Sequence, residues 1–372
     1  MKIALGIIAF ILLAFSPIRI DLSNTGDLAP KIFDQRPEFF VLEWKQGTRL
    51  TEKNIAISIE IYDSSRTPVT ALVNKKGEPE MYTADLATPV CADGECKLMH
   101  IRMYWTLLGE YAGFDRYPAL PLTKHDHDEF LEADYRKLHQ LLIDNNSVLG
   151  RRKIDQLVIK PEKPKEEGVD GASGATIAAV KESVVSGALY SCYIAWHLAH
   201  GEVKDQLKKY TLAHLNHEMV IDMLNSSNRD YQMFALNSLD LNQYERHYTR
   251  IAEIFRTSIP LVRTFIIKNL PDVFWNGPQL QQPFWQSFSQ IDVNSRSLLL
   301  DHLDQAPAVT ISDLSFDLGV MSKNQLKGYL LHLSERDPVI DQTIIANLKL
   351  FGVSKTQPYS YLVEQYLENI EQ

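Results

Sequence analysis

A stretch rich in glycine and hydroxyl residues, VDGASGATIAAV at positions 169–180, has the composition of a ligand-binding turn. Gly171 and Gly174 let the backbone come close to a bound group, and Ser173 and Thr176 add hydroxyls. The apolar residues that follow are spaced as in a buried or half-buried helix, whose start carries unpaired N–H groups and a partial positive charge. The pattern therefore indicates an anion site, such as one for phosphate. A capped helix with a glycine turn and no ligand explains the same residues.

Other motifs with chemical meaning are weaker. The chain has no G-x-x-x-x-G-K-[ST], no G-x-G-x-x-G after a strand and no C-x-x-C-H. His125 and His127 alternate in KHDHDE, which suits either two metal ligands on an extended segment or a solvated helix cap. Because an H-x-H beside acidic residues is more often a cap, we assign no metal site.

Two of the three cysteines lie close together in the sequence. Cys91 and Cys96 bracket ADGE, in which Asp93-Gly94 is a strong turn signal. We predict a structural disulfide between them, with a redox-active dithiol and two unrelated thiols as the alternatives. Cys192, in LYSCYIAWHL, is interpreted as a small buried hydrophobe.

Length and charge limit the classes of protein that fit. A chain of 372 residues with 45% hydrophobic composition exceeds one typical domain, so two domains are expected. The 38 basic and 47 acidic side chains give a net charge of -9, and no Lys/Arg-rich run stands out. Nucleic acid and anionic membrane surfaces are therefore not expected partners.

The N-terminus has the pattern of an export signal. Lys2 precedes thirteen apolar residues, Ile3 to Phe15, and Pro17 and Arg19 end the run. This length fits a secretory signal core and falls short of the roughly 18 residues of a membrane span. We expect residues 1–20 to be a signal peptide or an uncleaved anchor, and the protein to be periplasmic or otherwise exported. Membrane contact is expected only through this segment, if it stays uncleaved.

Residues 21–201 are expected to form an α/β domain with several strands in one sheet. NIAISIEIY and LMHIRMYW alternate apolar and polar residues, and a hairpin is expected around VNKKGEPEM. An amphipathic helix is expected to begin after Asp126 or Asp128 and to pack on the sheet, and a short strand is expected at QLVIK. The apolar face of that helix is predicted to contain Phe130, Leu131, Tyr135, Leu138, Leu141 and Leu142.

Residues 202–372 are expected to be all helical. Leucine-rich segments begin near 230, 260, 293 and 323, a spacing of about thirty residues typical of stacked helix pairs of the HEAT or armadillo kind. An irregular helical bundle is the alternative. The predicted fold class is thus an α+β domain followed by an all-α domain.

The seven residues DGASGAT are similar to the D-x-x-S-G-A-[ST] signature of the FMN-binding domain family, which includes the covalent-flavin subunits of sodium-pumping and Rnf-type respiratory complexes. In that family the last Thr or Ser receives FMN through a phosphoester bond, installed outside the cytoplasm by a flavin transferase that uses FAD. The resemblance implies FMN on Thr176, with Asp170, Ser173, Gly174 and Ala175 as the recognition sequence. Sequence around the signature, roughly residues 88–201, also resembles exported members of this family.

The resemblance implies an exported electron-transfer flavoprotein, more a component of an oxidoreductase than a stand-alone enzyme. Its implied partners are a flavin transferase and an unidentified redox partner in the cell envelope. Tyr104 and Trp105 are candidates to cover the flavin ring, with a place in the core as the alternative. Ala178 stands where many members carry a further hydroxyl residue. The alternative function is therefore a binding or scaffold protein that uses the helical domain and keeps a vestigial signature.

Overall fold

The computed structural model describes residues 31–61, 65–90, 97–125, 127–159, 175–176, 178–335 and 341–370. The chain divides into two compact units. The sheet unit contains residues 1–40 and 44–207, and the helical unit contains residues 41–43 and 208–372. The order of an α+β part followed by an all-α part agrees with the predicted fold class.

The sheet unit is built on an antiparallel sheet with seven strands among the described residues, in the order β1-β3-β4-β5-β6-β7-β2. The expected strands at NIAISIEIY, LMHIRMYW and QLVIK and the expected hairpin are all present. The strands are β1 Ile32–Phe33, β2 Phe39–Phe40, β3 Leu50–Glu60, β4 Arg66–Val73, β5 Pro79–Pro89, β6 Leu98–Trp105 and β7 Tyr111–Arg116; β8 Val158–Ile159 pairs separately with β9 Ala175–Thr176.

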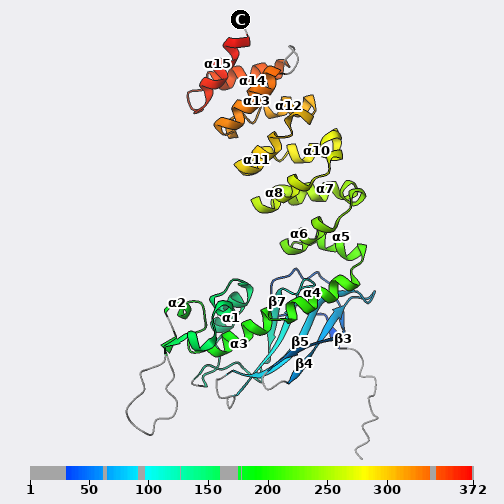
Figure 1. Cartoon of the computed structure of the whole chain (residues 1–372), viewed down its shortest axis with the longest axis vertical. Helices are drawn as coiled ribbons and strands as arrows, with labels where there is room; N and C mark the ends of the chain where they lie inside the picture. The colour runs from blue at the N-terminus through cyan, green and yellow to red at the C-terminus, as the bar shows by residue number, and fades with distance from the viewer. Residues whose placement is uncertain are drawn as a thin grey trace, which may run out of the picture. The chain divides into compact units, whose positions relative to one another are not determined.

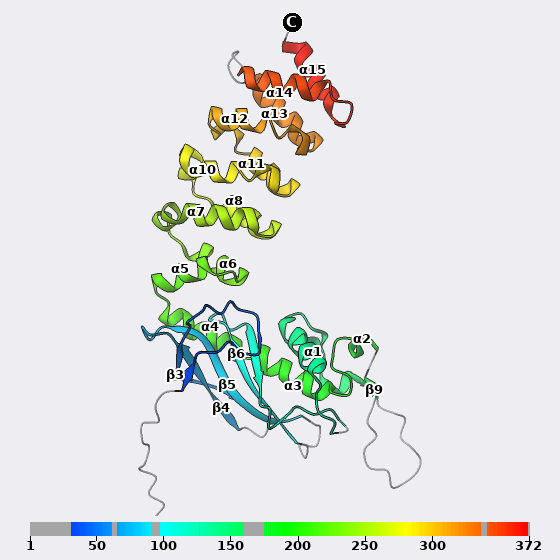
Figure 2. The same cartoon turned by 180° about the vertical axis from the view of Figure 1, so that it is seen from behind.

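The sheet is curled because its two outer strands are joined by a short connection. β1 and β2 lie at opposite edges of the sheet, yet only residues 34–38 connect them. Six chain steps reach about 21 Å at most, whereas the outer strands of a flat seven-stranded sheet would lie about 29 Å apart. The edges must therefore approach each other, and the curvature of β3 to β7 is visible from both sides (Figures 1 and 2).

One face of the sheet forms the core with two helices, α1 Glu132–Ile143 and α3 Leu189–His200. Trp105 is fully buried on this face, and its indole N–H donates to the carbonyl of Ala199 in α3 at 2.9 Å. Gly113 in β7 allows β2 to pair closely, since a Cβ there would lie 2.1 Å from the carbonyl oxygen of Phe39. The 3-10 turns η2 Val148–Arg151 and η3 Ile154–Gln156 lead from α1 to β8.

The helix α1 differs from its prediction at its first turn. Asp128 does not cap it, and Asp126 lies outside the described residues. The helix begins after Leu131, whose backbone N–H donates to the carboxylate of Asp134 at 2.9 Å. Leu131 itself is 68% exposed, because it precedes the helix and does not share its buried face. The other residues predicted for that face are buried: Phe130, Tyr135, Leu138, Leu141 and Leu142.

The helical unit consists of helix pairs, each in contact with the next (Figure 1). Four helices, α6, α8, α11 and α13, begin at 229, 260, 293 and 323, which confirms the predicted spacing of about thirty residues. The helix bounds are α4 Val203–His214, of which residues 203–207 belong to the sheet unit, α5 His217–Asn225, α6 Arg229–Ser238, α7 Leu241–Thr257, α8 Pro260–Asn269, α9 Asp272–Asn276, α10 Pro278–Trp285, η4 Phe288–Gln290, α11 Val293–Leu300, η5 Leu303–Gln305, α12 Ala308–Leu314, η6 Leu318–Val320, α13 Lys323–Glu335, α14 Gln342–Gly352 and α15 Ser360–Ile370.

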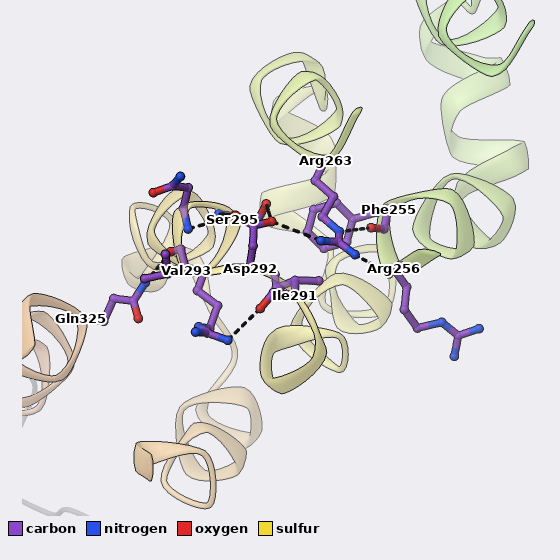
Figure 3. A network of polar contacts seen from close by, with 10 residues as sticks. Phe255, Arg256, Arg263, Ile291, Asp292, Val293, Ser295 and Gln325 are labelled. Carbon is purple, nitrogen blue, oxygen red and sulfur yellow. Dashed lines mark hydrogen bonds and ion pairs between the residues drawn. The ribbon is translucent and has the colours of Figure 1, made fainter. Parts of the chain in front are cut away.

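Arginine side chains hold neighbouring helices of the stack together by hydrogen-bonding the carbonyls that a helix end leaves unpaired. The guanidinium of Arg263 in α8 donates to the carbonyls of Phe255 and Arg256 at the end of α7, both at 2.9 Å (Figure 3). It also pairs with the carboxylate of Asp292 at 3.2 Å. The guanidinium of Arg250 in α7 likewise donates to the carbonyls at the end of α5, those of Leu224, Asn225 and Ser226. The stack is therefore held by polar contacts as well as by its apolar core.

The next link in the stack runs from Asp292 to α13. The Asp292 carboxylate caps the start of α11 by accepting from the backbone N–H and the hydroxyl of Ser295, at 3.0 and 2.6 Å (Figure 3). Burial raises the pKa of Asp292, but the hydrogen bonds from Ser295 and Arg263 outweigh it and lower the pKa overall. Gln325 in α13 then donates to the carbonyl of Val293 at 2.6 Å.

Candidate functional site

The signature DGASGAT is described only at its last two residues. Ala175 and Thr176 form β9, which pairs antiparallel with β8 so that Thr176 lies opposite Val158 and Ala175 opposite Ile159. The other candidate cofactor-binding residues, Asp170, Ser173 and Gly174, lie outside the described residues. The structure therefore places the backbone of the proposed attachment residue in a short strand.

The segment after the signature is not the single long helix that its apolar spacing predicts. A short helix, α2 Ala178–Lys181, is separated from α3 by a turn that contains Gly187 at φ +73°. Val180, Val184 and Val185 are nonetheless buried. A helix of four residues offers little of the dipole expected at an anion site, so α2 by itself would attract a phosphate only weakly. The case for a phosphate at Thr176 then rests on the signature.

A polar cluster lies on the sheet face opposite to the one that packs on α1 and α3. Asp85, Arg102 and Asp115 stand directly opposite one another on β5, β6 and β7. The Arg102 guanidinium donates twice to the Asp85 carboxylate, at 2.5 and 2.7 Å, and the Tyr117 hydroxyl donates to the same carboxylate at 2.5 Å. Cross-strand register thus brings together residues that the sequence separates.

The ionisation of this cluster is fixed by its neighbours. Burial raises the pKa of Asp85, but hydrogen bonds from Arg102 and Tyr117 outweigh it and hold the carboxyl pKa below its usual value. Burial and the contact with Asp85 raise the pKa of Tyr117 to about 12. Near neutral pH, Asp85 is therefore an anion and Tyr117 a hydrogen-bond donor, an arrangement that orients polar groups rather than exchanging protons.

Tyr104 and Trp105, both candidates for covering a flavin, lie on opposite faces of β6. Trp105 belongs to the core that packs on α3. The Tyr104 hydroxyl donates to the Asp115 carboxylate at 2.6 Å, and burial, with the Asp115 charge, raises the pKa of Tyr104 well above its ordinary value. Of the two candidates, Tyr104 therefore faces the polar cluster.

Tyr104 also lines a cavity of about 540 Å³. The short connection between β1 and β2, which includes Asp34 and Arg36, forms part of its wall, and Glu38 donates its backbone N–H to Asp115 at 2.6 Å. Both cationic and anionic side chains line this cavity, so charge alone favours neither an anion nor a cation. The sequence did not predict this cavity, because it depends on the curl of the sheet. The charged lining residues are Lys31, Asp34, Arg36, Glu38, Arg102, Asp115 and Arg116.

The predicted disulfide between Cys91 and Cys96 falls outside the described residues. Cys192 is buried in α3, as predicted for a small hydrophobe, and its sulfur accepts from the backbone N–H of Val185 at 3.4 Å. Burial raises the pKa of the Cys192 thiol to about 12, so it is an inert thiol at neutral pH. Its place in the core is structural.

The described part of the chain holds no group of three or more His, Cys, Asp or Glu side chains arranged to bind a metal ion. His125 lies next to the turn at Gly187, whose carbonyl accepts its backbone N–H at 2.7 Å. His127 has a positive φ of 65°, which fits a residue in a tight turn.

Within the residues described, no helix combines the length and the apolar character needed to cross a membrane.

Comparison of the chain with protein-family models, with curated proteins and with solved structures finds no match.

Proposed function

We propose that this protein is an exported flavoprotein that carries FMN in phosphoester linkage to Thr176 and transfers electrons in the cell envelope. The proposal is carried by the signature DGASGAT, whose final residue is the hydroxyl residue that the FMN-binding domain family modifies. The apolar segment Ile3 to Phe15 supports it, because attachment in that family takes place outside the cytoplasm.

The chemistry of attachment fits a threonine hydroxyl. A flavin transferase would join the phosphorus of the FMN half of FAD to the Oγ1 atom of Thr176, while the pyrophosphate bond breaks and AMP leaves. The pairing of Thr176 with Val158 supports the proposal, because a residue in a β-ladder has a fixed backbone. Once attached, FMN supplies the redox chemistry, and the protein supplies its position and surroundings.

In this proposal the α+β part is an FMN-binding domain over residues 21–201, and residues 202–372 form a HEAT-like array. The redox partner is an envelope protein that remains to be identified. The Cys91–Cys96 disulfide belongs to the same proposal, because an exported protein folds in an oxidising compartment. Electron transfer is favoured over turnover of a small molecule because the covalent-flavin subunits of that family are parts of respiratory complexes.

The helical unit suggests a second candidate function, that of a binding or scaffold protein. Several large apolar side chains on its helices are more than half exposed, although a folded unit gains nothing from leaving them in water. Where exposed apolar side chains gather in one patch, they mark a surface that binds another protein. They are Leu261, Val309, Phe316, Leu331, Leu350 and Val353.

Visible absorbance of the purified protein tests the first proposal and separates it from the second. The full-length gene is expressed with a flavin transferase, and the protein is denatured and passed over a desalting column. We expect flavin absorbance to stay with the polypeptide, to be lost in Thr176→Ala and to persist in Thr176→Ser, since the family accepts either hydroxyl. A colourless wild-type protein would contradict the flavoprotein proposal and favour the binding function.

A further inference from the structure

A groove of about 350 Å³ lies between α11 and α13 within the helical unit. Its apolar wall includes Leu303, which is buried, and Leu331, which is 58% exposed at the rim. Its residues come from the second helices of two consecutive pairs and from the turn between them. The lining residues are Ser297, Leu300, Asp301, Leu303, Asp304, Asn324, Gln325, Gly328, Leu331, His332 and Glu335.

The charge of this groove has one sign. Asp301, Asp304 and Glu335 are exposed carboxylates, and no lysine or arginine occurs among the described residues that line the groove. This differs from the cavity in the sheet unit, which is lined by both cationic and anionic residues. Three carboxylates beside leucine side chains complement a ligand with a positive charge next to an apolar group.

Gly328 leaves the middle of α13 open on the groove side. A Cβ built at Gly328 would meet no atom within 4 Å, so no packing requirement explains a residue that weakens a helix. The absence of a side chain lets another polypeptide approach the helix backbone closely.

His332 adds a polar group to the groove wall. It is buried, and its Nδ1 lies 3.0 Å from the carboxylate of Asp304. Its Nε2 has no hydrogen-bond partner among the residues described. A buried polar atom without a partner lowers stability, and a polar group of a ligand would relieve that cost.

We propose that this groove binds a peptide segment of another protein in which lysine or arginine adjoins an apolar side chain. The apolar side chain would contact Leu303 and Leu331, and the cation would lie near Asp301 and Glu335. This inference rests on the second candidate function, binding by the helical unit, and does not depend on flavin at Thr176.

Fluorescence anisotropy with the full chain and two labelled synthetic peptides tests the proposal. We expect an alternating Leu/Lys peptide to bind and its Leu/Glu counterpart not to bind. Neutralising the groove by Asp301→Asn, Asp304→Asn and Glu335→Gln together should weaken binding about tenfold. A control with the same charge change elsewhere on the unit should bind within about twofold of wild type: Glu245→Gln, Glu364→Gln and Glu368→Gln.

Two substitutions at Gly328 locate the binding site. Gly328→Trp should abolish binding by filling the groove, whereas Gly328→Ala should leave it open, and both proteins should keep the wild-type thermal transition or raise it. Absence of Leu/Lys binding, or equal weakening by the two charge variants, would overturn the proposal. Binding that survives Gly328→Trp would place the contact elsewhere on the unit, so the groove would be wrong while the second candidate function stands. Thr176→Ala should bind the peptide as wild type does.

Discussion

In the sheet unit Arg102 pairs with Asp85 across neighbouring strands, whereas in the helical unit Arg263 hydrogen-bonds the carbonyls that end a neighbouring helix. The difference follows from the backbone. A sheet satisfies its own polar groups along the ladder, which leaves side chains free to form a cluster on one face. A helix leaves four carbonyls unpaired at its end, so side chains are needed there. Polar side chains in the sheet unit are therefore available for a site, while many in the helical unit hold the stack together.

The largest effect that tests this comparison is expected from Trp105→Ala in the core of the sheet unit. Removing a fully buried indole creates a cavity and loses the hydrogen bond to Ala199, at a cost of about 3–5 kcal/mol. Hydrogen exchange by mass spectrometry should show lost protection in β5, β6 and β7. His100→Ala, on the other face of β6, is the control and should change little. Unchanged exchange in Trp105→Ala would show that this face is not the core.

A smaller loss is expected from Arg263→Ala in the helical unit. The substitution leaves the carbonyls of Phe255 and Arg256 without their donor and Asp292 without its cation, at a cost of about 2 kcal/mol. Urea unfolding followed by circular dichroism measures it. Arg229→Ala removes an exposed arginine and should have almost no effect. If both variants unfold at the same urea concentration, the contacts of Arg263 do not hold these helices together.

Gly328→Ala should stabilise the helical unit. Alanine is a better helix former than glycine by about 1 kcal/mol, and its methyl group would meet no other atom. The expected gain is about 2–4 °C in the thermal transition. A loss of stability would mean that the space beside Gly328 is filled, which would also remove the basis of the proposed groove.

The smallest effect is a loss of stability of the sheet unit at mildly acidic pH. Burial lowers the pKa of His139, His197 and His200, so these imidazoles are protonated more readily in the unfolded chain. The stability that these neutral imidazoles contribute to the folded state is therefore fully present above the ordinary histidine pKa of about 6.5. It is lost as the pH falls toward the lower pKa values that these histidines have in the folded protein. The lowered pKa of Asp85 changes stability only at more acidic pH, where a carboxyl group begins to be protonated. It therefore does not contribute to the loss expected between pH 7 and pH 5.

The effect is measured as the urea concentration at which the sheet unit is half unfolded, at pH 7 and at pH 5. Hydrogen exchange of β5 to β7 reports the unfolding of this unit. His197→Gln, which keeps a polar group near the carbonyl of Leu149, should reduce the difference between the two pH values. A midpoint that does not change with pH in the wild-type protein would contradict the assignment of these imidazoles as buried and neutral.

Period and alternation in the sequence predict local elements well here. Alternation predicts β3 and β6, and the thirty-residue spacing predicts α6, α8, α11 and α13, because each pattern follows from the geometry of one strand or one helix. The apolar spacing does not predict the break between α2 and α3, although Ser186-Gly187 is a turn signal inside the apolar run.

The polar cluster was not predictable in the same way. Asp85, Arg102 and Asp115 meet because of strand register, and the short connection from β1 to β2 crosses between the two edges of a curled sheet. Neither register nor curvature follows from the hydrophobic pattern of a single strand. Alternation along β6 places Tyr104 on the polar face of the sheet, yet Tyr104 is buried. It is buried because the curled sheet and the connection from β1 to β2 surround it.

Intact mass of the exported chain, produced together with a flavin transferase, tests the flavoprotein proposal most directly. We predict a gain equal to one FMN less one water in the wild-type protein and in Thr176→Ser, and no gain in Thr176→Ala. A wild-type mass without this gain, in a preparation where a known flavinylated protein acquires it, would contradict the account. The signature would then be a structural turn, and the search for function would move to the helical unit.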